Sequence, residues 1–318
     1  MNMTMAVPRH DRQLTHLRDL APRIGAFTVA PLGAGQIAAA LAVLADHYGP
    51  DISPERLVPP SDAAALRADL AKAAPQLIDL VGELREALEG RYSAVVVPQL
   101  GIGYLPVPDR SALLFALSAA LGAPTATDKV TRRVVWDVKV RKEKVEDNTV
   151  STFSEHPYEA DLHTDTQYFE QPERYMLLYV VAPARCGGGI STMRALQCLR
   201  RELSATPEGC WAMEYLTGRE LPFRIPAVFT RDGKGDSIEV TFAPIFGARP
   251  AIRYRLDTLN KGLELYPELD TPDLRRALSI VDSAACNPER LVTLVMPSDS
   301  LQLLNNHEAL HGRSPFTD

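Results

Sequence analysis

The sequence predicts a mixed fold in which an N-terminal helical region packs on a mainly β core. Up to residue 91, alanine- and leucine-rich stretches carry apolar residues at α-helical spacing, whereas from Tyr92 onward short apolar or β-branched runs alternate with turn residues. At 318 residues, 46% of them hydrophobic, the chain is long enough to bury a full core. We therefore expect residues 1–91 to form a helical region packed on a core of residues 92–318, in one functional domain.

Helical periodicity marks two segments of the first region, Gly35–Tyr48 and Asp62–Leu88. Pro75 lies inside the second segment. Because proline lacks a backbone N–H and suits the first turn of a helix, we expect one helix to end before Pro75 and another to begin there. These helices are expected to be a scaffold on the outside of the core.

Strands are expected where apolar and β-branched residues run for four to seven positions between turn residues. These runs are Ala94–Val97, Val134–Val140, Tyr175–Val181, Ile238–Phe242, Leu291–Met296 and Ser300–Leu304. Two helices should interrupt them, Met193–Leu203 and Pro272–Ala284, the second with Thr271 as its N-cap. The polar segment Arg141–Leu162 lacks such patterns and is a candidate lid.

Two short motifs lie 148 residues apart, counted from the first histidine of one to the last histidine of the other (311 − 163). The first is His163-Thr164-Asp165, and the second ends in His311-Gly312-Arg313. In an extended segment alternate side chains point the same way, so His163 and Asp165 can face one point that His311 completes. Each of these residues alone is more often structural. Together, two imidazoles and one carboxylate are the donor set of non-haem iron(II) oxygenases, which leaves coordination positions open.

Around these motifs the sequence resembles the taurine dioxygenase and clavaminate synthase-like (TauD/TfdA) superfamily. The resemblance runs from about Tyr92 to the last residue and rests on HTDTQYFEQPERYMLLYV, the GGGIST loop and SDSLQLLNNHEALHGRSPF, in that order. It implies a double-stranded β-helix, the jelly-roll architecture shared with cupins. It also implies Fe(II), with 2-oxoglutarate and dioxygen as co-substrates. His163, Asp165 and His311 would be the iron ligands, and Ser191, with Thr192 as the alternative, would bind the far carboxylate of 2-oxoglutarate.

The resemblance implies hydroxylation, or desaturation, of an unactivated C–H bond in an amino acid or a related secondary-metabolite intermediate. Related halogenases replace the ligand carboxylate with a small residue to make room for chloride. Asp165 is intact, so halogenation is disfavoured. Asn305 and Asn306, just before the second motif, could hold the strand that presents His311 or could form a backbone turn.

One departure from the family concerns the arginine that binds 2-oxoglutarate, which the family places about a dozen residues after the second histidine. Here seven residues follow His311 (318 − 311), and their only arginine, the co-substrate candidate Arg313, lies two positions on. Either a further strand lies beyond the sequence given, or another arginine such as Arg253 or Arg255 takes this role. We expect the C-terminus to be incomplete.

Substrate contacts are expected from residues that follow the first motif, Gln167 and Tyr168. Arg253 and Arg255 alternate along the strand-like IRYRLD and could hold a substrate carboxylate. Each of these residues could equally be structural.

Composition limits the partners. A net charge of −6 and a pI near 5.7 disfavour nucleic acid and anionic membranes, which need a basic face. The N-terminal residues lack a signal-peptide core, and a cytoplasmic location is expected. An open barrel edge could drive homo-oligomerisation. Two other functions remain open, a cupin-like metalloprotein that does not use 2-oxoglutarate and a catalytically silent ligand-binding protein.

Overall fold

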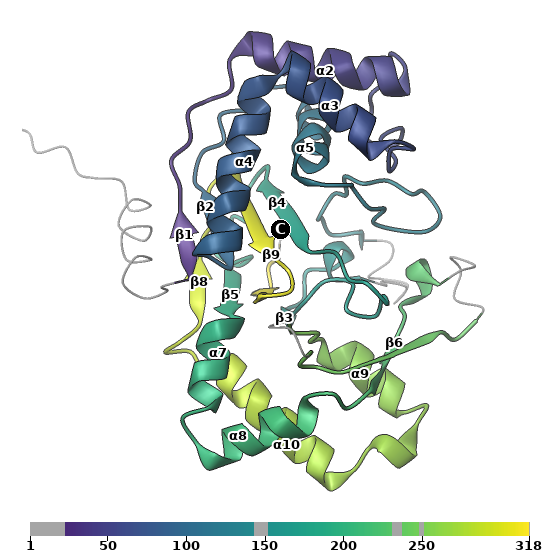
Figure 1. Ribbon diagram of the computed structural model, residues 1–318, viewed down its shortest axis with the longest axis vertical. Coiled ribbons are helices and arrows are strands. Elements are labelled where there is room, and N and C mark those ends of the chain that lie inside the picture. The colour runs from purple at the N-terminus through teal and green to yellow at the C-terminus, as the bar shows by residue number, and fades with distance from the viewer. Residues whose placement is uncertain (1–22, 143–151, 231–236, 248–250, 318) are drawn as a thin grey trace, which may run out of the picture.

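Helices lie at both ends of the molecule and β-sheets lie between them, as the computed structural model shows (Figure 1). The structure describes residues 23–142, 152–230, 237–247 and 251–317. Helices α2 to α5 gather at the upper end in this view, and α7 to α10 at the lower end. The mixed helix and sheet composition predicted from the sequence is confirmed.

The upper helices are α2 (Ala34–Tyr48), α3 (Ala63–Ala73), α4 (Pro75–Gly90) and α5 (Val107–Leu121). The predicted helices of the first region are confirmed, and Pro75 stands at the first position of α4 as expected. Asp62 caps α3, because its carboxylate accepts the backbone N–H of Ala65 at 2.9 Å. Helix α5 is not predicted, since it is buried on almost every side and lacks a polar stripe that would reveal its period.

The first sheet has the strand order β1 (Ile24–Ala26), β2 (Ala94–Val97), β9 (Ser300–Asn305) and β4 (Tyr175–Val180). Strand β1 is parallel to β2, and the other pairs are antiparallel. Side chains alternate across this sheet. Val95 and Leu303 pack against the upper helices, whereas Val96 and Leu304 face the opposite side.

The second sheet has the order β3 (Ala160–His163), β10 (Ala309–Arg313), β5 (Ser191–Ala195) and β8 (Val292–Leu294), all antiparallel. Its apolar residues Met193, Leu294 and Ala309 share a buried core with Val96 and Leu304 of the first sheet. The two sheets therefore pack face to face.

The lower part is a second core made of helices around a hairpin. Its elements are α7 (Leu196–Leu203), α8 (Pro207–Leu216), β6 (Leu221–Arg224), β7 (Val240–Ala243), α9 (Leu256–Leu263) and α10 (Pro272–Ala285). Three 3-10 turns, η1 (Phe153–Glu155), η2 (Ala227–Phe229) and η3 (Pro267–Leu269), complete the described elements. Thr271 caps α10 as predicted, accepting the N–H of Leu274 at 3.2 Å.

Three sequence predictions need correction. The segment Met193–Leu203 is helical only from Leu196, because its first residues complete β5. Residues 253–255 of IRYRLD form no strand, and α9 begins at Leu256. Val134–Val140 is not a strand either. No sheet edge accepts it, and the N–H groups of Lys139 and Arg141 bond instead to the carbonyls of Ser154 and Glu155.

The expected boundary at residue 91 falls between elements that contact each other. Strand β1 pairs with β2 across it, and α5 packs with the helices that precede it. The division into 1–91 and 92–318 stays a prediction. The centre of the candidate lid, residues 143–151, lies outside the described residues. Within the described part of the chain, no helix has the length and apolarity required to cross a membrane.

Asp299 joins the first sheet to the loop after β2. Its carboxylate accepts the N–H groups of Gly101 at 2.9 Å and Ile102 at 3.0 Å, and the hydroxyl of Tyr179 at 2.8 Å. The residue itself has a φ of 66°, which most side chains avoid.

We expect the substitution D299A to lower the free energy of unfolding by about 2–3 kcal/mol, because three donors lose a charged acceptor. Urea unfolding followed by circular dichroism measures this. S298A, at the exposed neighbouring position, is the control and should change stability by less than about 0.5 kcal/mol. An equal effect of both variants would contradict this account.

Candidate metal centre

The two sequence motifs meet because their strands are neighbours. Strand β3 ends at His163, and β10 places His311 directly opposite it. Asp165 follows two residues after His163 and lies on the same side, as alternation along an extended chain requires. The structure thus brings together the three residues that the sequence singles out.

The donor atoms of these residues lie within 4.8 Å of one another. The Nε2 atoms of His163 and His311 each lie 3.5 Å from an oxygen of the Asp165 carboxylate. The ring centroids of the two histidines are 4.3 Å apart. This is the donor set of a divalent transition metal, with two nitrogens and one carboxylate pointing at one region.

His163 is oriented by its own strand. Its Nδ1 lies 2.7 Å from the carbonyl oxygen of Asp161, which can only accept a hydrogen bond. The geometry therefore assigns the proton to Nδ1 and leaves the lone pair of Nε2 for a metal. The Nδ1 atom of His311 is buried and has no hydrogen-bond partner among the described residues.

The charges in the site favour the protonation states that bind metal. Burial opposes ionisation of Asp165, but the charge of His311, then the hydrogen bond and charge of His163, outweigh it and lower the pKa of Asp165. Burial, reinforced by the charges of His163 and Arg255, lowers the pKa of His311 from 6.5 to about 4, although Asp165 opposes this shift. Carboxylate and neutral imidazole are the forms that coordinate metals.

Asn306 clamps the loop that carries Asp165. Its side-chain oxygen accepts the N–H of Asp165 at 2.8 Å, and its Nδ2 donates to the carbonyls of Asp165 and Glu173, each at 2.9 Å. Asn305 instead accepts the N–H of His307 within the turn. Asn306 therefore holds the loop of Asp165 rather than the strand of His311, and Asn305 stabilises a turn.

Gly312 lets β3 and β10 come close beside the site. A Cβ atom there would lie 2.6 Å from the carbonyl oxygen of Ala160 and 2.8 Å from the hydroxyl of Thr192. The β3–β10 register shifts at this point, between His311 and Arg313. The glycine of the HGR motif is therefore a packing requirement that the sequence alone does not explain.

The predicted co-substrate residues lie on β5 and β10. Ser191 is paired with Arg313 and shares the face of His311, whereas Thr192 is paired with Gly312 and faces the other way. The guanidinium of Arg313 donates to the carbonyls of Phe153, His156 and Tyr158. Arg313 therefore holds the loop before β3.

The predicted substrate residues have different surroundings. Gln167 is fully buried, with its Nε2 on the hydroxyl of Thr258, and Tyr168 packs in an aromatic cluster with Phe169 and Phe229. Arg253 donates to the carbonyls of Gln167, Phe169 and Glu170.

Arg255 is different from the other arginines. It pairs with Asp257, and its guanidinium carbon lies 4.2 Å from the ring centroid of Phe153. The Phe153 ring in turn contacts the ring of His163, with centroids 4.9 Å apart. Sequence reasoning did not identify Phe153 or Asp257, because no motif marks them.

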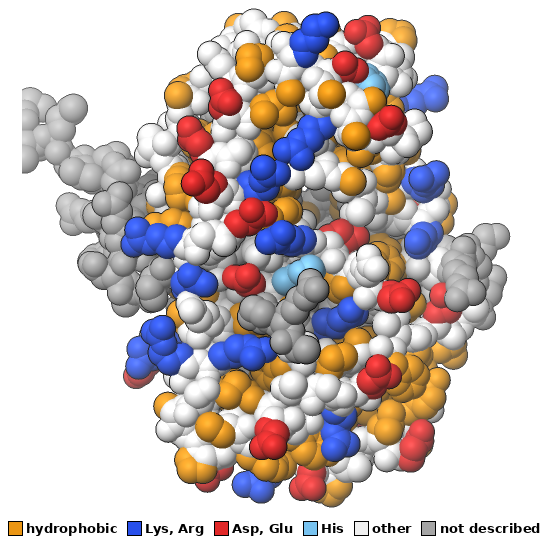
Figure 2. Space-filling model, in the orientation of Figure 1, with side chains coloured by type: hydrophobic (Ala, Val, Ile, Leu, Met, Phe, Trp, Pro, Cys, Tyr) orange, Lys and Arg blue, Asp and Glu red, His pale blue; other side chains and the backbone are white. Residues whose placement is uncertain are grey.

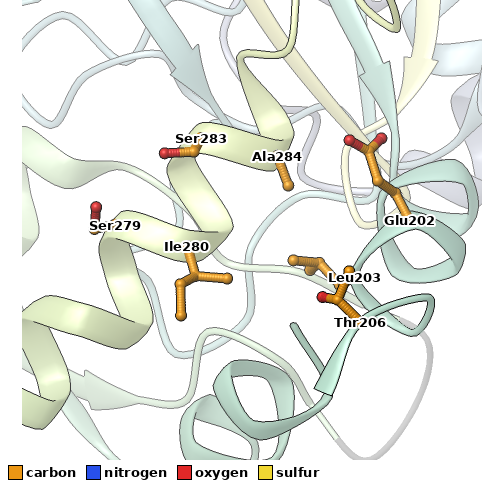
Figure 3. A pocket seen from close by; sticks show the side chains of 7 residues that line it. All are labelled: Glu202, Leu203, Thr206, Ser279, Ile280, Ser283 and Ala284. Carbon is orange, nitrogen blue, oxygen red and sulfur yellow. The ribbon is translucent and has the colours of Figure 1, made fainter. Parts of the chain in front are cut away.

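The molecular surface around these elements is mixed in charge. Figure 2 shows a histidine side chain at the middle of one face, between basic and acidic side chains. A separate groove between α7 and α10 is lined by Glu202, Thr206, Ser279 and Ser283 with three apolar residues (Figure 3). In this groove Glu202 already accepts hydrogen bonds from Arg194 and Asn287.

Comparison with known protein families shows which family the chain belongs to. Residues 55–318 match the taurine catabolism dioxygenase TauD, TfdA family. The match covers most of the sequence, and the chain belongs to this family of dioxygenases. The resemblance predicted from the motifs is confirmed. No curated protein gives a significant match.

Solved structures share the fold at low sequence identity. One is asparagine oxygenase in complex with Fe(II), 2S,3S-3-hydroxyasparagine and succinate, with 16% identity, a TM-score of 0.61, and coverage of 92% of this chain and 88% of that chain. Another is the non-heme iron oxygenase OrfP in complex with Fe and alpha-ketoglutaric acid, with 19% identity, a TM-score of 0.59, and coverage of 92% and 89%. At these identities the similarity concerns the fold.

We expect the substitution N306A to weaken the affinity for divalent metal about 10–100-fold, because Asp165 loses the amide that fixes its backbone. Anaerobic titration with Fe(II) or Co(II) measures the affinity. N305A is the matched control, since Asn305 is equally buried and has no contact with Asp165. Unchanged metal affinity in folded N306A would rule out a positioning role.

The metal-free protein should lose stability as the pH falls below the ordinary pKa of histidine. His311 has a lowered pKa, so between 6.5 and about 4 the unfolded chain binds a proton that the folded chain does not. From about pH 7 to about pH 5 this costs about 2 kcal/mol.

Urea unfolding of the metal-free protein at the two pH values measures this loss. H311Q should show a correspondingly smaller loss, whereas H47Q, at a histidine of α2 far along the chain from the site, should behave as the wild type. The interpretation is wrong if H311Q and the wild type have the same pH dependence.

Proposed function

We propose that this protein is a non-haem Fe(II)- and 2-oxoglutarate-dependent oxygenase that hydroxylates, or desaturates, an unactivated C–H bond of an amino acid or a related small molecule. The observation that carries the proposal is the convergence of His163, Asp165 and His311 within 4.8 Å in a chain of the TauD, TfdA family. Jointly these residues supply the facial donor set that such chemistry needs.

The residues present fit an iron(II) ion. His163 would offer Nε2 while Asp161 holds its Nδ1, and Asp165 would offer the carboxylate that Asn306 positions through the backbone. Iron with 2-oxoglutarate and dioxygen would supply the oxidising power for C–H cleavage. The role of the chain is to hold the ion in a fixed geometry, orient the C–H bond and exclude water. The carboxylate of Asp165 would take the coordination position that related halogenases leave to chloride, which disfavours halogenation.

For the co-substrate we propose Ser191 rather than Thr192. Ser191 is 7% exposed, and its strand register directs it to the face of His311. Thr192 faces the opposite side, next to Gly312. Arg313 already donates through Nη1 and Nη2 to carbonyls in the loop of Phe153 and His156, and its Nε has no partner among the described residues. The alternative to 2-oxoglutarate binding is a cupin-like metalloprotein that does not use this co-substrate.

An amino-acid substrate is supported by the solved complexes. Asparagine oxygenase is recorded with 3-hydroxyasparagine, and OrfP with (3S)-hydroxy-L-Arg and (3R,4R)-dihydroxy-L-Arg. We extend this substrate class to the present chain as a proposal. The proposal also includes three expectations from the sequence. These are a small-molecule partner, a cytoplasmic location and a homo-oligomeric state.

We also propose that the two face-to-face sheets are the halves of a double-stranded β-helix, flanked by the helical region of residues 1–91. The order β3-β10-β5-β8 beside β2-β9-β4 supports this, because strands next to each other in a sheet are distant in the sequence. Such an interleaved order is typical of jelly-roll folds.

The test is an anaerobic titration of the protein with Fe(II) and then 2-oxoglutarate, followed by the visible charge-transfer absorption of the chelated keto acid. We expect the band in the wild type and in H47A, and its loss in H163A, because one of the two imidazole donors is removed. Aerobic turnover should then yield succinate.

The competing functions give other results. Iron binding without the band and without succinate would identify the metalloprotein that does not use 2-oxoglutarate. Failure to bind any divalent metal would identify a catalytically silent ligand-binding protein.

A further inference from the structure

Three arginines lie near the metal centre, and their hydrogen bonds separate them. Arg253 and Arg313 each donate to three main-chain carbonyls. Among the described residues, the guanidinium of Arg255 bonds to Asp257 alone, through Nε at 2.8 Å and Nη2 at 3.2 Å. No hydrogen bond joins its Nη1 to a described residue, and the residue is 8% exposed. This nitrogen can therefore donate to a ligand without breaking a hydrogen bond to any described residue.

The guanidinium of Arg255 is held in one orientation. The Asp257 carboxylate accepts hydrogen bonds from Nε and Nη2 along one edge of the guanidinium. The guanidinium carbon lies 4.2 Å from the ring centroid of Phe153. Such a fixed fork loses little freedom when it binds a second, planar acceptor on its other edge. The free edge, formed by Nη1 and Nη2, suits a carboxylate.

Arg255 also lies beside the metal ligands. Phe153 touches both the guanidinium and the ring of His163. Tyr254, the residue before Arg255, accepts the N–H of Thr164 at 2.7 Å, between the two ligands of the first motif. The charge of Arg255 contributes to the low pKa of Asp165 and of His311.

The order of the strands shows on which side of the metal centre Arg255 lies. The order is β3-β10-β5, so the ligand strands β3 and β10 have β5 with Ser191 on one side. The segment of Tyr254 and Arg255 contacts the chain at Thr164, just past β3, on the other side. With the co-substrate at Ser191, the side of the site next to Arg255 would be left for the substrate.

We propose that Arg255 binds a free carboxylate of the substrate, with Asp257 and Phe153 as positioning residues. The inference rests on the proposed function and narrows it. It selects amino acids with a free carboxylate and rejects those esterified or tethered to a carrier, because a neutral ester or thioester offers no anion to the guanidinium.

The experiment uses the protein loaded anaerobically with Fe(II) and 2-oxoglutarate. Calorimetry measures the binding of acetate, of the common L-amino acids, and of the primary amide of each amino acid that binds. At least one L-amino acid should bind, and its amide should bind far more weakly. R255Q should weaken the binding of the amino acid at least about 30-fold, as expected when a buried charge pair loses one partner.

R255Q should leave the affinity for the amide and for 2-oxoglutarate unchanged, which a purely structural role would not predict. D257N, which keeps the positive charge but releases the fork, should show an intermediate loss. R276Q removes an exposed arginine that also stacks on an aromatic ring, and it is the control. Thermal melting of each variant checks that it is folded.

Other outcomes would overturn the inference. Equal binding of the amino acid by wild type and R255Q is one, and loss of the 2-oxoglutarate band in R255Q, which would make Arg255 the co-substrate anchor, is another. Absence of any carboxylate binding, even of acetate at high concentration, is a third. If the band never forms in the wild type, the proposed function fails instead, and the same binding series on the metal-free protein still tests Arg255.

Discussion

The site depends on the pairing of β10 with β3, which sets His311 opposite His163. A slip of one residue would turn His311 to the other face of the sheet, so this register is a condition for any metal site here. Gly312 permits it by allowing the carbonyl of Ala160 to come close. Because β10 also pairs with β5, the same strand fixes Ser191 relative to the histidines. Strand β10 therefore sets the positions of both neighbouring strands, β3 with His163 and β5 with Ser191.

The electrostatic balance of the site has a consequence for stability. The two imidazoles beside the Asp165 carboxylate are largely removed from water, and placing such polar groups there is costly in the absence of a cation. Burial keeps His311 neutral, and the charge of Arg255 also disfavours a proton on its ring. Both effects free a nitrogen lone pair. The binding of a metal can then recover part of the stability lost by burying polar groups, since the ion satisfies all three donors at once.

The sequence predicts elements whose pattern is local. Helices α2, α3, α4 and α10 follow from periodicity, Pro75 and Thr271, and β2, β4 and β9 from continuous apolar runs. Prediction from the sequence fails where the structure of a segment depends on which other segment it contacts. Val134–Val140 has the composition of a strand but no neighbouring strand, and β5 continues into α7 without a turn residue to mark the change. The role of Asn306 depends on a contact across 141 residues.

The same contrast explains why metal donors are easier to predict than anion anchors. A metal site requires particular residue types, and two of them must be two positions apart in an extended segment, so HTD is recognisable. An arginine reaches its ligand on a long side chain from any nearby element, so spacing gives no restriction. In the sequence, no spacing rule separates Arg253 from Arg255, and Arg313 lies too close to His311 for the position that the family uses. Their hydrogen bonds distinguish them in the structure. Arg253 and Arg313 each use three of five N–H donors on main-chain carbonyls, whereas the described contacts of Arg255 use two, both on Asp257, so Arg255 keeps more donors for a ligand.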